Sequence, residues 1–282
     1  MVLTIGSVAE QILPSGMQCK IIVIDNDLTP SAGALISDAC SKLGIKCTYL
    51  HAPGQNISIA RNAGLSACRT RWLAFVDDDE IASRDWLSRL LANRNGAVAV
   101  FGPCEAIYPD KAAGWIRFGD YHSNRVVSRD GVIDTGYTSN VLIDMDFVRS
   151  HKLRFDEEYG RTGGEDTIFF YQMYRCGGHL AYAAGAIVYD QVAPSRITLR
   201  WVAARQYRAG QTYAKLQEKY VVKRFFRILI LSPLKIAYCV SMAALLAFRP
   251  GAAMWWLMRG VFHFGTLSYR LGGNVYKEYL RS

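Results

Sequence analysis

Four acidic residues, Asp77 to Glu80, directly follow the apolar run 72–76. Five apolar residues bounded by a turn signal are typical of a strand buried on both faces of a parallel sheet. Open α/β sheets bind their ligands at the carboxyl ends of such strands. Four crowded carboxylates repel one another unless a cation neutralises them, and their oxygens suit Mg²⁺ or Mn²⁺ with nucleotide phosphates as further ligands. We therefore predict a metal and nucleotide site, in preference to the alternative of a solvated acidic turn before the next helix.

A second acidic pair, Glu165 and Asp166, follows the glycine-containing loop 160–164 and begins a helix expected at 167–174. Acidic residues are common in first helical turns because the helix dipole favours negative charge there. Two acidic turns in one α/β domain also suit a transfer reaction. In that reading a metal at the first turn holds a diphosphate leaving group, and a free carboxylate at the second takes a proton from the nucleophile.

The elements that must position these residues alternate between strands and helices. Strands are predicted at 20–24, 47–50, 72–76 and 97–101, and helices at 31–43, 59–68 and 86–93, with Ser31 and Ser58 as helix caps. This alternation indicates an α/β fold with a parallel or mostly parallel sheet and helices on both faces. No elements are assigned to residues 103–135, which are rich in Gly, Pro and Asp.

The expected first strand of a nucleotide-binding domain has no counterpart in this chain. Residues from Met1 onward predict a helix, with Leu3, Ile5, Val8 and Ile12 as its apolar positions. A first strand, central in the usual strand order, is expected upstream of Met1. The sheet is therefore expected to contain an unfilled gap or a rearranged order, and the alternatives are a start further upstream or a truncated, disabled form.

Cysteine and histidine spacing gives no metal or disulfide signature. The seven cysteines include no Cys-x-x-Cys pair, and the five histidines lack metal-ligand spacing. We expect reduced, buried thiols and a cytosolic compartment.

Charge separates the chain into two parts, predicted as a catalytic domain at 1–195 and a helical tail at 196–282. The tail holds 15 Lys and Arg against two Glu, a net charge of +13, while residues 1–195 carry −4. Its basic residues alternate with long aliphatic runs rather than with polar and stacking aromatic residues, which argues against a nucleic-acid partner.

The tail is predicted to bind an anionic membrane surface. Its apolar run 228–248 approaches the ~20 residues that a span requires. Lys235 near the middle of this run makes spanning marginal. Arg208, Lys215, Lys219 and Lys223 form one basic helical stripe, as in helices that lie on anionic leaflets. The alternative is a helical hairpin buried against the catalytic domain.

Four motifs taken together resemble the inverting family-2 glycosyltransferases of GT-A fold, especially the bacterial succinoglycan-type exopolysaccharide branch. They are Asp25-Asn26-Asp27, the segment 56–64, the segment 75–80 and Gly164-Glu165-Asp166. The resemblance covers about residues 1–210, and the set is specific although each motif alone is weak.

The resemblance implies a role for each of these positions. Asp166 would be the catalytic base, with Glu165 orienting or contacting the acceptor, and Asp79 would bind Mg²⁺ or Mn²⁺. The implied contacts to the nucleotide-sugar come from Asp25 and Asn26 at the base, from Arg61, Asp77 and Asp78 near the nucleotide, from Asn140 in the loop 136–140 at the sugar, and from Arg205 and Arg208 at the diphosphate. The alternative for the loop 136–140 is a plain turn, and the alternative for Arg205 and Arg208 is a solvated helix face.

The implied reaction moves a single hexose from a UDP-sugar to a lipid-linked saccharide at the cytoplasmic membrane face. The Gln-x-x-Arg-Trp motif of processive synthases is not reproduced, because Ile197 stands where the Gln would precede Arg200-Trp201. One alternative is a metal-dependent nucleotidyltransferase, although no Gly-rich, basic phosphate loop is found. The other is a degenerate membrane-bound scaffold, against which the retention of Asp77, Asp79 and Asp166 argues.

Overall fold

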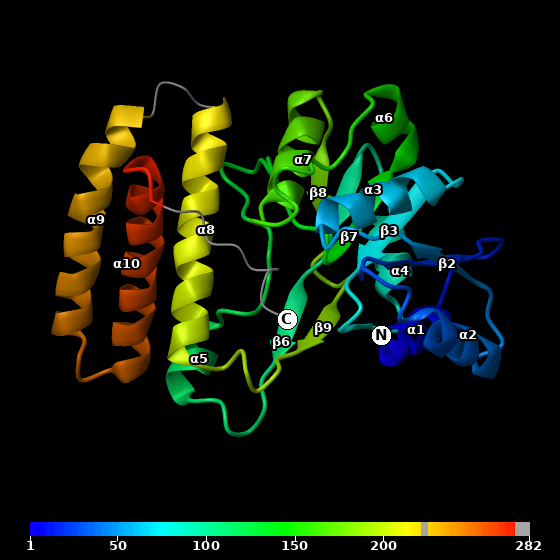
Figure 1. Ribbon diagram of the computed structural model, residues 1–282, viewed down its shortest axis with the longest axis horizontal. Coiled ribbons are helices and arrows are strands. Elements are labelled where there is room, and N and C mark those ends of the chain that lie inside the picture. The colour runs from blue at the N-terminus through cyan, green and yellow to red at the C-terminus, as the bar shows by residue number, and fades with distance from the viewer. Residues whose placement is uncertain (221–224, 274–282) are drawn as a thin grey trace. The chain divides into compact units, whose positions relative to one another are not determined.

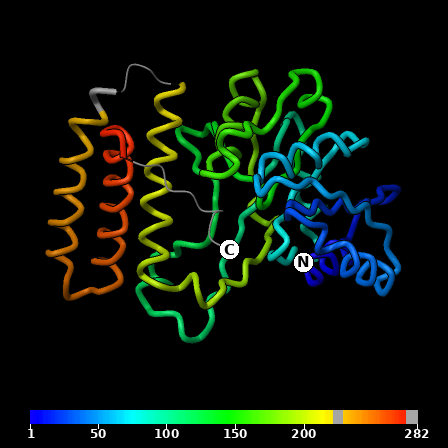
Figure 2. Tube along the Cα trace, viewed as in Figure 1, coloured from blue at the N-terminus to red at the C-terminus, as the bar shows by residue number. Residues whose placement is uncertain are grey.

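The computed structural model describes residues 1–220 and 225–273, which form two compact units. The α/β unit comprises Met1–Glu105 and Ser123–Asp190, and the helical unit comprises Ala106–His122 and the described residues that follow Asp190. Figure 2 traces the chain through both units. This division differs from the predicted one at Ala106–His122 and at residues 191–195, which the prediction assigns to the catalytic domain and which cluster with the helical unit.

The α/β unit follows the predicted alternation closely (Figure 1). Its strands, two of which extend just past the unit boundary, are β1 (Ile21–Asp25), β2 (Cys47–His51), β3 (Trp72–Val76), β4 (Glu80–Ala82), β5 (Ala99–Phe101), β6 (Cys104–Ile107), β7 (Asn140–Asp144), β8 (Leu180–Tyr182) and β9 (Val188–Gln191). Its helices are α1 (Val2–Ala9), α2 (Gly33–Lys42), α3 (Ile57–Ala67), α4 (Trp86–Ala92), α6 (Met145–Ser150) and α7 (Glu165–Arg175).

The larger sheet has the order β3-β7-β5-β8 and contains one reversed strand. β7 runs antiparallel to both β3 and β5, whereas β5 and β8 are parallel. Strands β3, β5 and β8 therefore share one direction, as a mostly parallel sheet requires. A second, three-stranded sheet has the order β4-β9-β6. In the larger sheet Val76 pairs with Asn140, so the residues just before β7 lie beside the carboxyl end of β3.

The expected gap in the sheet is present. Among the described residues, β1 pairs only with β2 and β3 pairs only with β7, so each has an unpaired edge. Helix α1 joins the two parts: Ile5 packs in the cluster that contains β1 residues, and Val8 packs against the cluster that contains β3 residues. All five residues of β3 are partly exposed, which corrects the prediction that this strand is buried on both faces.

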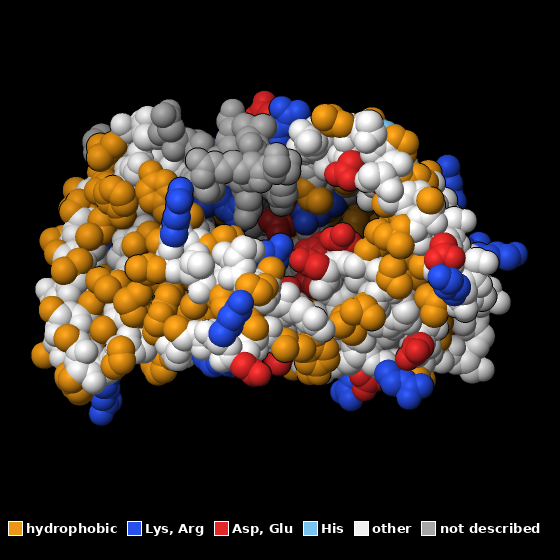
Figure 3. Space-filling model, turned by 60° about the horizontal axis from the view of Figure 1, so that its bottom comes forward, with side chains coloured by type: hydrophobic (Ala, Val, Ile, Leu, Met, Phe, Trp, Pro, Cys, Tyr) orange, Lys and Arg blue, Asp and Glu red, His pale blue; other side chains and the backbone are white. Residues whose placement is uncertain are grey.

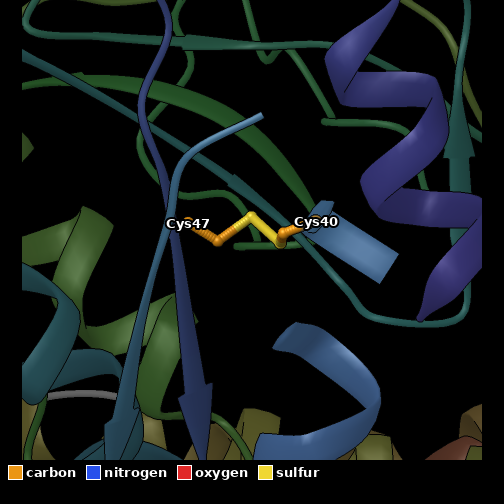
Figure 4. Close-up of a disulfide and its surroundings, with 2 residues drawn as sticks. All are labelled: Cys40 and Cys47. Atoms are coloured by element: carbon orange, nitrogen blue, oxygen red, sulfur yellow. A yellow bond between two sulfur atoms is a disulfide. The ribbon is translucent and has the colours of Figure 1, made fainter. Parts of the chain in front are cut away.

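Two helix caps and one pair of cysteines differ from the sequence predictions. Asn56, not Ser58, caps α3 by accepting the Ser58 N–H, and the Ser31 hydroxyl donates to Asp27 instead of capping α2. Cys40 at the end of α2 and Cys47 at the start of β2 form a disulfide (Figure 4). The prediction of reduced thiols is wrong for this pair, because the short turn between the two elements places the two Cα atoms 6.3 Å apart. Cys19 and Cys176 are free but exposed, not buried.

The helical unit contains α5 (Gly114–Gly119), α8 (Leu199–Tyr220), α9 (Phe225–Leu245) and α10 (Pro250–Arg270). Figures 1 and 2 show the three long helices side by side, and α10 contacts both α8 and α9. Two glycines permit the approach of α8 to α10. A Cβ atom at Gly210 would lie 1.9 Å from the Phe262 carbonyl oxygen, and one at Gly265 would lie 2.0 Å from the Tyr207 carbonyl oxygen.

Helix α9 presents an apolar face to solvent. Ile230, Leu234 and Tyr238, spaced four residues apart, are 64%, 63% and 57% exposed. Figure 3 shows hydrophobic side chains gathered over the helical unit. Within the part of the chain that the structure describes, one segment, Ile228–Leu245, is long and apolar enough to cross a membrane. Lys223 of the predicted basic stripe lies outside the described residues.

Candidate active site

The acidic turn between β3 and β4 separates exposed from buried carboxylates. Asp78 and Asp79 are exposed, Asp77 is partly buried, and Glu80 is 3% exposed. The Glu80 N–H donates to the Asp77 carbonyl oxygen at 3.2 Å, and the Thr4 hydroxyl of α1 donates to the Asp78 carbonyl oxygen at 2.7 Å. The turn is thus tied to α1 while two of its carboxylates remain open to solvent.

Helices α3 and α7 contribute an ion pair beside this turn. Arg61 Nη1 donates to Glu165 Oε1, and both side chains are largely buried. The Arg61 guanidinium also lies 5.7 Å from the centre of the Phe155 ring. The second Glu165 oxygen, Oε2, is buried and has no hydrogen-bond partner in the structure. Burial has thus left one oxygen of this carboxylate without a protein hydrogen-bond donor.

The two acidic clusters and Arg61 form one electrostatic group. Burial raises the pKa of Asp77, the Arg61 charge opposes that rise, and Asp79, Asp78 and Asp166 add to it. Burial also raises the pKa of Glu165, with Asp166 adding to the rise and Arg61 opposing it. Such mutual effects require proximity, so the structure brings together residues that the sequence separates by about a hundred positions.

Asp166 is placed in the first turn of α7 and is partly exposed. Its Oδ1 atom accepts the Thr167 N–H at 2.6 Å and the Thr167 hydroxyl at 3.3 Å. Those hydrogen bonds fix the orientation of the carboxylate and use only one of its oxygens. The other oxygen can receive a proton from a ligand.

Asp25 organises the end of β1. Its carboxylate is 6% exposed and accepts hydrogen bonds from the Tyr49 hydroxyl at 2.6 Å and from the Ala32 and Asp27 N–H groups. Burial alone would raise the pKa of Asp25, but these hydrogen bonds outweigh it and hold the pKa below its usual value. The Asn26 backbone carbonyl oxygen accepts a hydrogen bond from the Gln55 N–H, and the Asn26 side-chain oxygen accepts one from the Asn56 N–H. The nucleobase contacts of Asp25 and Asn26 stay predictions.

Asn140 has a core environment that the sequence did not suggest. Its side chain is fully buried; Nδ2 donates to the Pro103 and Ala186 carbonyl oxygens, and Oδ1 accepts the Trp86 indole N–H at 2.7 Å. Both amide hydrogens and the carbonyl oxygen are engaged within the fold. The predicted contact of Asn140 with the sugar stays a prediction; the neighbouring Thr138 and Ser139 hydroxyls are buried without hydrogen-bond partners.

Arg205 and Arg208 lie on α8 of the helical unit. The Arg205 guanidinium stacks over the Trp201 ring at 5.4 Å, and that ring stacks on His122. Their predicted contact with the diphosphate stays a prediction.

The acidic turn fits a divalent cation that is completed by substrate. The described residues contain no group of three or more His, Cys, Asp or Glu residues arranged to hold a metal ion by themselves. Mg²⁺ is commonly held by one or two carboxylates together with substrate phosphates rather than by a full protein cage. The exposed carboxylates of Asp78 and Asp79 supply that donor set.

Sequence reasoning missed the residues beneath the turn. The sequence suggests Glu80 as one of four crowded carboxylates at a metal site, yet its side chain is buried and accepts a hydrogen bond from the buried thiol of Cys104. The only local signal is its position at the start of β4, where side chains alternate between the two faces of a strand.

The chain is similar to a known family and to two curated proteins. Residues 2–151 match the model of glycosyl transferase family 2. The succinoglycan biosynthesis protein ExoM of Rhizobium meliloti (strain 1021) is 39% identical over 282 residues, covering 98% of this chain and 90% of that protein. ExoO of the same organism is 26% identical over 200 residues, covering 64% of this chain and 55% of its own length.

Solved structures share the fold at low sequence identity. The mannosyltransferase PcManGT from Pyrobaculum calidifontis, in complex with GDP-Man and Mn²⁺, matches with a TM-score of 0.64 at 12% identity, over 95% of this chain and 82% of that one. TarS 1–349 of S. aureus, in complex with UDP, matches with a TM-score of 0.50 at 14% identity, over 97% and 88%. These likenesses show the GT-A fold.

Proposed function

Because the chain belongs to glycosyl transferase family 2, we propose that it transfers a single hexose from a UDP-sugar to a lipid-linked saccharide with inversion at the anomeric carbon. The similarity to ExoM supports a role in exopolysaccharide biosynthesis. Solved relatives of the same fold bind UDP, UDP-GlcNAc and GDP-Man, which supports a nucleotide-sugar donor. Family membership also sets aside the nucleotidyltransferase alternative.

One observation carries this proposal: Arg61, Asp77, Asp79, Glu165 and Asp166 converge from α3, the turn after β3 and α7. The group combines exposed carboxylates, a buried arginine and a carboxylate with a free oxygen. A sugar transfer needs these three elements: a place for the charged diphosphate, an electropositive group near it and a base for the acceptor.

In the proposed reaction, Asp166 accepts the proton of the acceptor hydroxyl through the oxygen that Thr167 leaves free. The acceptor oxygen forms a bond to the anomeric carbon while the bond from that carbon to UDP breaks, so the configuration inverts in one displacement. Glu165, whose Oε2 atom lacks a hydrogen-bond partner, would orient or contact the acceptor. Arg61, whose guanidinium is held by its ion pair with Glu165, would lie near the nucleotide.

Asp79 would hold Mg²⁺ or Mn²⁺ against the diphosphate, with Asp77 and Asp78 nearby. When bound, the cation supplies charge neutralisation for the departing UDP.

Metal-dependent nucleotide binding is the direct test. Titration of UDP-, GDP- and dTDP-sugars into the purified protein by calorimetry, with and without Mn²⁺, should show binding of a UDP-sugar that depends on the metal. Asp79→Asn should weaken that metal-dependent affinity at least about tenfold, the lower end of what altering metal-site residues costs. Asp38→Asn, which changes an exposed carboxylate paired with Lys42 on α2, is the matched control. Equal metal-dependent affinity in Asp79→Asn and the parent would rule out the assigned metal role, and no sugar-nucleotide binding at all would favour the scaffold alternative.

A further inference from the structure

Beneath the acidic turn lies a buried carboxylate whose two oxygens are both engaged. Glu80 Oε2 accepts the N–H of Asp77 at 3.1 Å, while the Glu80 N–H donates back to the Asp77 carbonyl oxygen. The side chain and the backbone of one residue thus close the turn from Asp77 to Glu80 from both sides. Asp78 and Asp79 lie at the exposed apex of that closed turn.

The other carboxylate oxygen, Glu80 Oε1, accepts the thiol of Cys104 at 3.0 Å. Cys104 is 1% exposed, and its backbone exchanges two hydrogen bonds with Asn124, at 3.0 and 2.9 Å. Burial raises the pKa of the Cys104 thiol, so that it keeps its proton and acts as a donor. The Glu80 side chain is therefore anchored on one side to the turn and on the other to Cys104, whose backbone pairs with Asn124.

A charged carboxylate that is buried beside other carboxylates is energetically unfavourable in the core of a fold. Burial and the neighbouring Asp77 both disfavour its charge. Apolar residues of similar volume at buried charged sites are often neutral or stabilising for the fold. The presence of Glu at position 80 is therefore explained better by the conformation that it imposes on the turn than by a contribution to the stability of the fold.

We propose that Glu80, anchored by the Cys104 thiol, is a positioning residue that sets the acidic turn in the geometry required to hold the metal–diphosphate group. The inference rests on the proposed function, because the turn is the proposed metal site. Residues that support metal ligands from behind commonly change metal affinity by about 10–100-fold when they are replaced.

The variants separate a lost hydrogen bond from lost packing. Glu80→Gln retains the size of the side chain, but its single carbonyl oxygen cannot replace both carboxylate oxygens as acceptors. Cys104→Ala removes the donor, whereas Cys104→Ser supplies a hydroxyl in its place. Glu105→Gln is the matched control, since Glu105 follows Cys104 directly but is half-exposed and paired with Arg125.

The measurement is calorimetric titration of UDP with and without Mn²⁺, together with the melting temperature of each variant. Glu80→Gln and Cys104→Ala should weaken the Mn²⁺-dependent affinity about tenfold, with metal-free affinity unchanged. Cys104→Ser and Glu105→Gln should match the parent.

Two results would overturn the inference while leaving the proposed function intact. One is parent-like affinity in both Glu80→Gln and Cys104→Ala. The other is Cys104→Ser as defective as Cys104→Ala, which would assign the effect to packing. If Glu80→Gln does not fold, the two Cys104 variants decide the question. A parent protein that shows no metal-dependent UDP binding would instead overturn the proposed function, and this inference with it.

Discussion

The carboxylates of the α/β unit divide by exposure into two groups with different uses. Asp78 and Asp79 face solvent and can meet a cation, whereas Glu80 and Glu165 are buried and bind other protein groups. An exposed carboxylate can change its ligands at little cost, but a buried one must keep its partners because an unpaired buried charge is strongly destabilising. The exposed pair therefore suits metal binding, Glu80 suits positioning of the turn, and Glu165 holds Arg61.

The ion pair between Arg61 and Glu165 shows where residue-level prediction ends. The sequence motifs identified both residues as site residues, but the pair spans 104 positions and no local pattern links them. Asn140 shows the same limit from the other side, since the family resemblance implied a sugar contact but could not indicate that its amide is hydrogen-bonded inside the core. Residue type is visible in a sequence, whereas the partner of a buried polar group depends on the tertiary fold.

Asp166→Asn should abolish most turnover without affecting donor binding. The amide cannot accept the acceptor proton, so the transfer rate should fall by roughly 10²–10⁴-fold, the usual contribution of a general base. Steady-state kinetics with calorimetric donor affinity checks both parts of the prediction. Glu165→Gln is the comparison, and near-normal turnover in Asp166→Asn would move the base to another residue.

His122 should make the stability of the helical unit depend on pH. Its ring is 2% exposed, contacts the Tyr108 hydroxyl and the Arg196 carbonyl oxygen, and stacks on Trp201. Burial, helped by the Arg205 and Arg196 charges and opposed by the hydrogen bond to the Arg196 carbonyl oxygen, lowers the pKa of His122 to about 4 from its ordinary 6.5. The unfolded chain therefore binds the proton more readily than the folded one.

The stability contributed by neutral His122 should be complete above pH 6.5 and should be lost as the pH falls toward 4. The full loss amounts to about 3 kcal/mol. Urea unfolding at several pH values, in the parent and in His122→Gln, measures the contribution of His122 to the free energy of unfolding. A parent-minus-variant difference that stays constant across the window would contradict the prediction.

At the scale of elements, the sequence predicted the strand and helix boundaries that depend on local residue patterns. The boundaries of β3 agree with the predicted run 72–76, because a short apolar stretch between polar turns has few alternatives. The reversal of β7 was not foreseen, since its direction depends on a connection that passes through the helical unit. The Cys40–Cys47 disulfide was missed for a similar reason: a separation of seven residues is no motif until a helix and a strand bring the two thiols together.

Gly265→Ala should destabilise the packing of α10 against α8. The added Cβ atom would overlap the Tyr207 carbonyl oxygen, which belongs to a helix backbone and cannot move aside as a flexible side chain can. Overpacking of this kind typically costs about 1–3 kcal/mol. Thermal unfolding should therefore show a lower melting temperature.

The control for this variant lies on the same helix. A Cβ atom at Gly260 would meet Cys239 at 3.4 Å, an ordinary contact. Gly260→Ala should therefore keep or raise the melting temperature, because Ala is favoured over Gly in a helix by about 1 kcal/mol. Equal effects of the two substitutions would show that backbone proximity does not determine the packing.

For the whole molecule, charge and apolar surface are concentrated in the C-terminal part of the chain. Residues 196–282 carry +13, whereas residues 1–195 carry −4. The exposed apolar residues of α9 accompany this basic charge, and Lys235 on the same helix is exposed. Basic and apolar groups together are typical of helices that bind anionic membrane surfaces. A lipid-linked acceptor would be presented at such a surface, so we propose that the reaction takes place at a membrane surface; that this is the cytoplasmic face stays a prediction.

The membrane proposal predicts a change in fractionation when the apolar stripe is made polar. The triple variant Ile230→Ser, Leu234→Ser and Tyr238→Ser removes exposed apolar groups from α9, so folding should be retained while membrane binding is lost. Replacing Leu28 and Val127, which are 65% and 66% exposed on the α/β unit, by Ser is the matched control. Flotation with anionic vesicles should separate the two variants.

High salt alone should release the parent only partly, because screening weakens the attraction of basic side chains but leaves apolar contacts in place. A parent protein that is monodisperse in the soluble fraction without detergent would contradict the proposal.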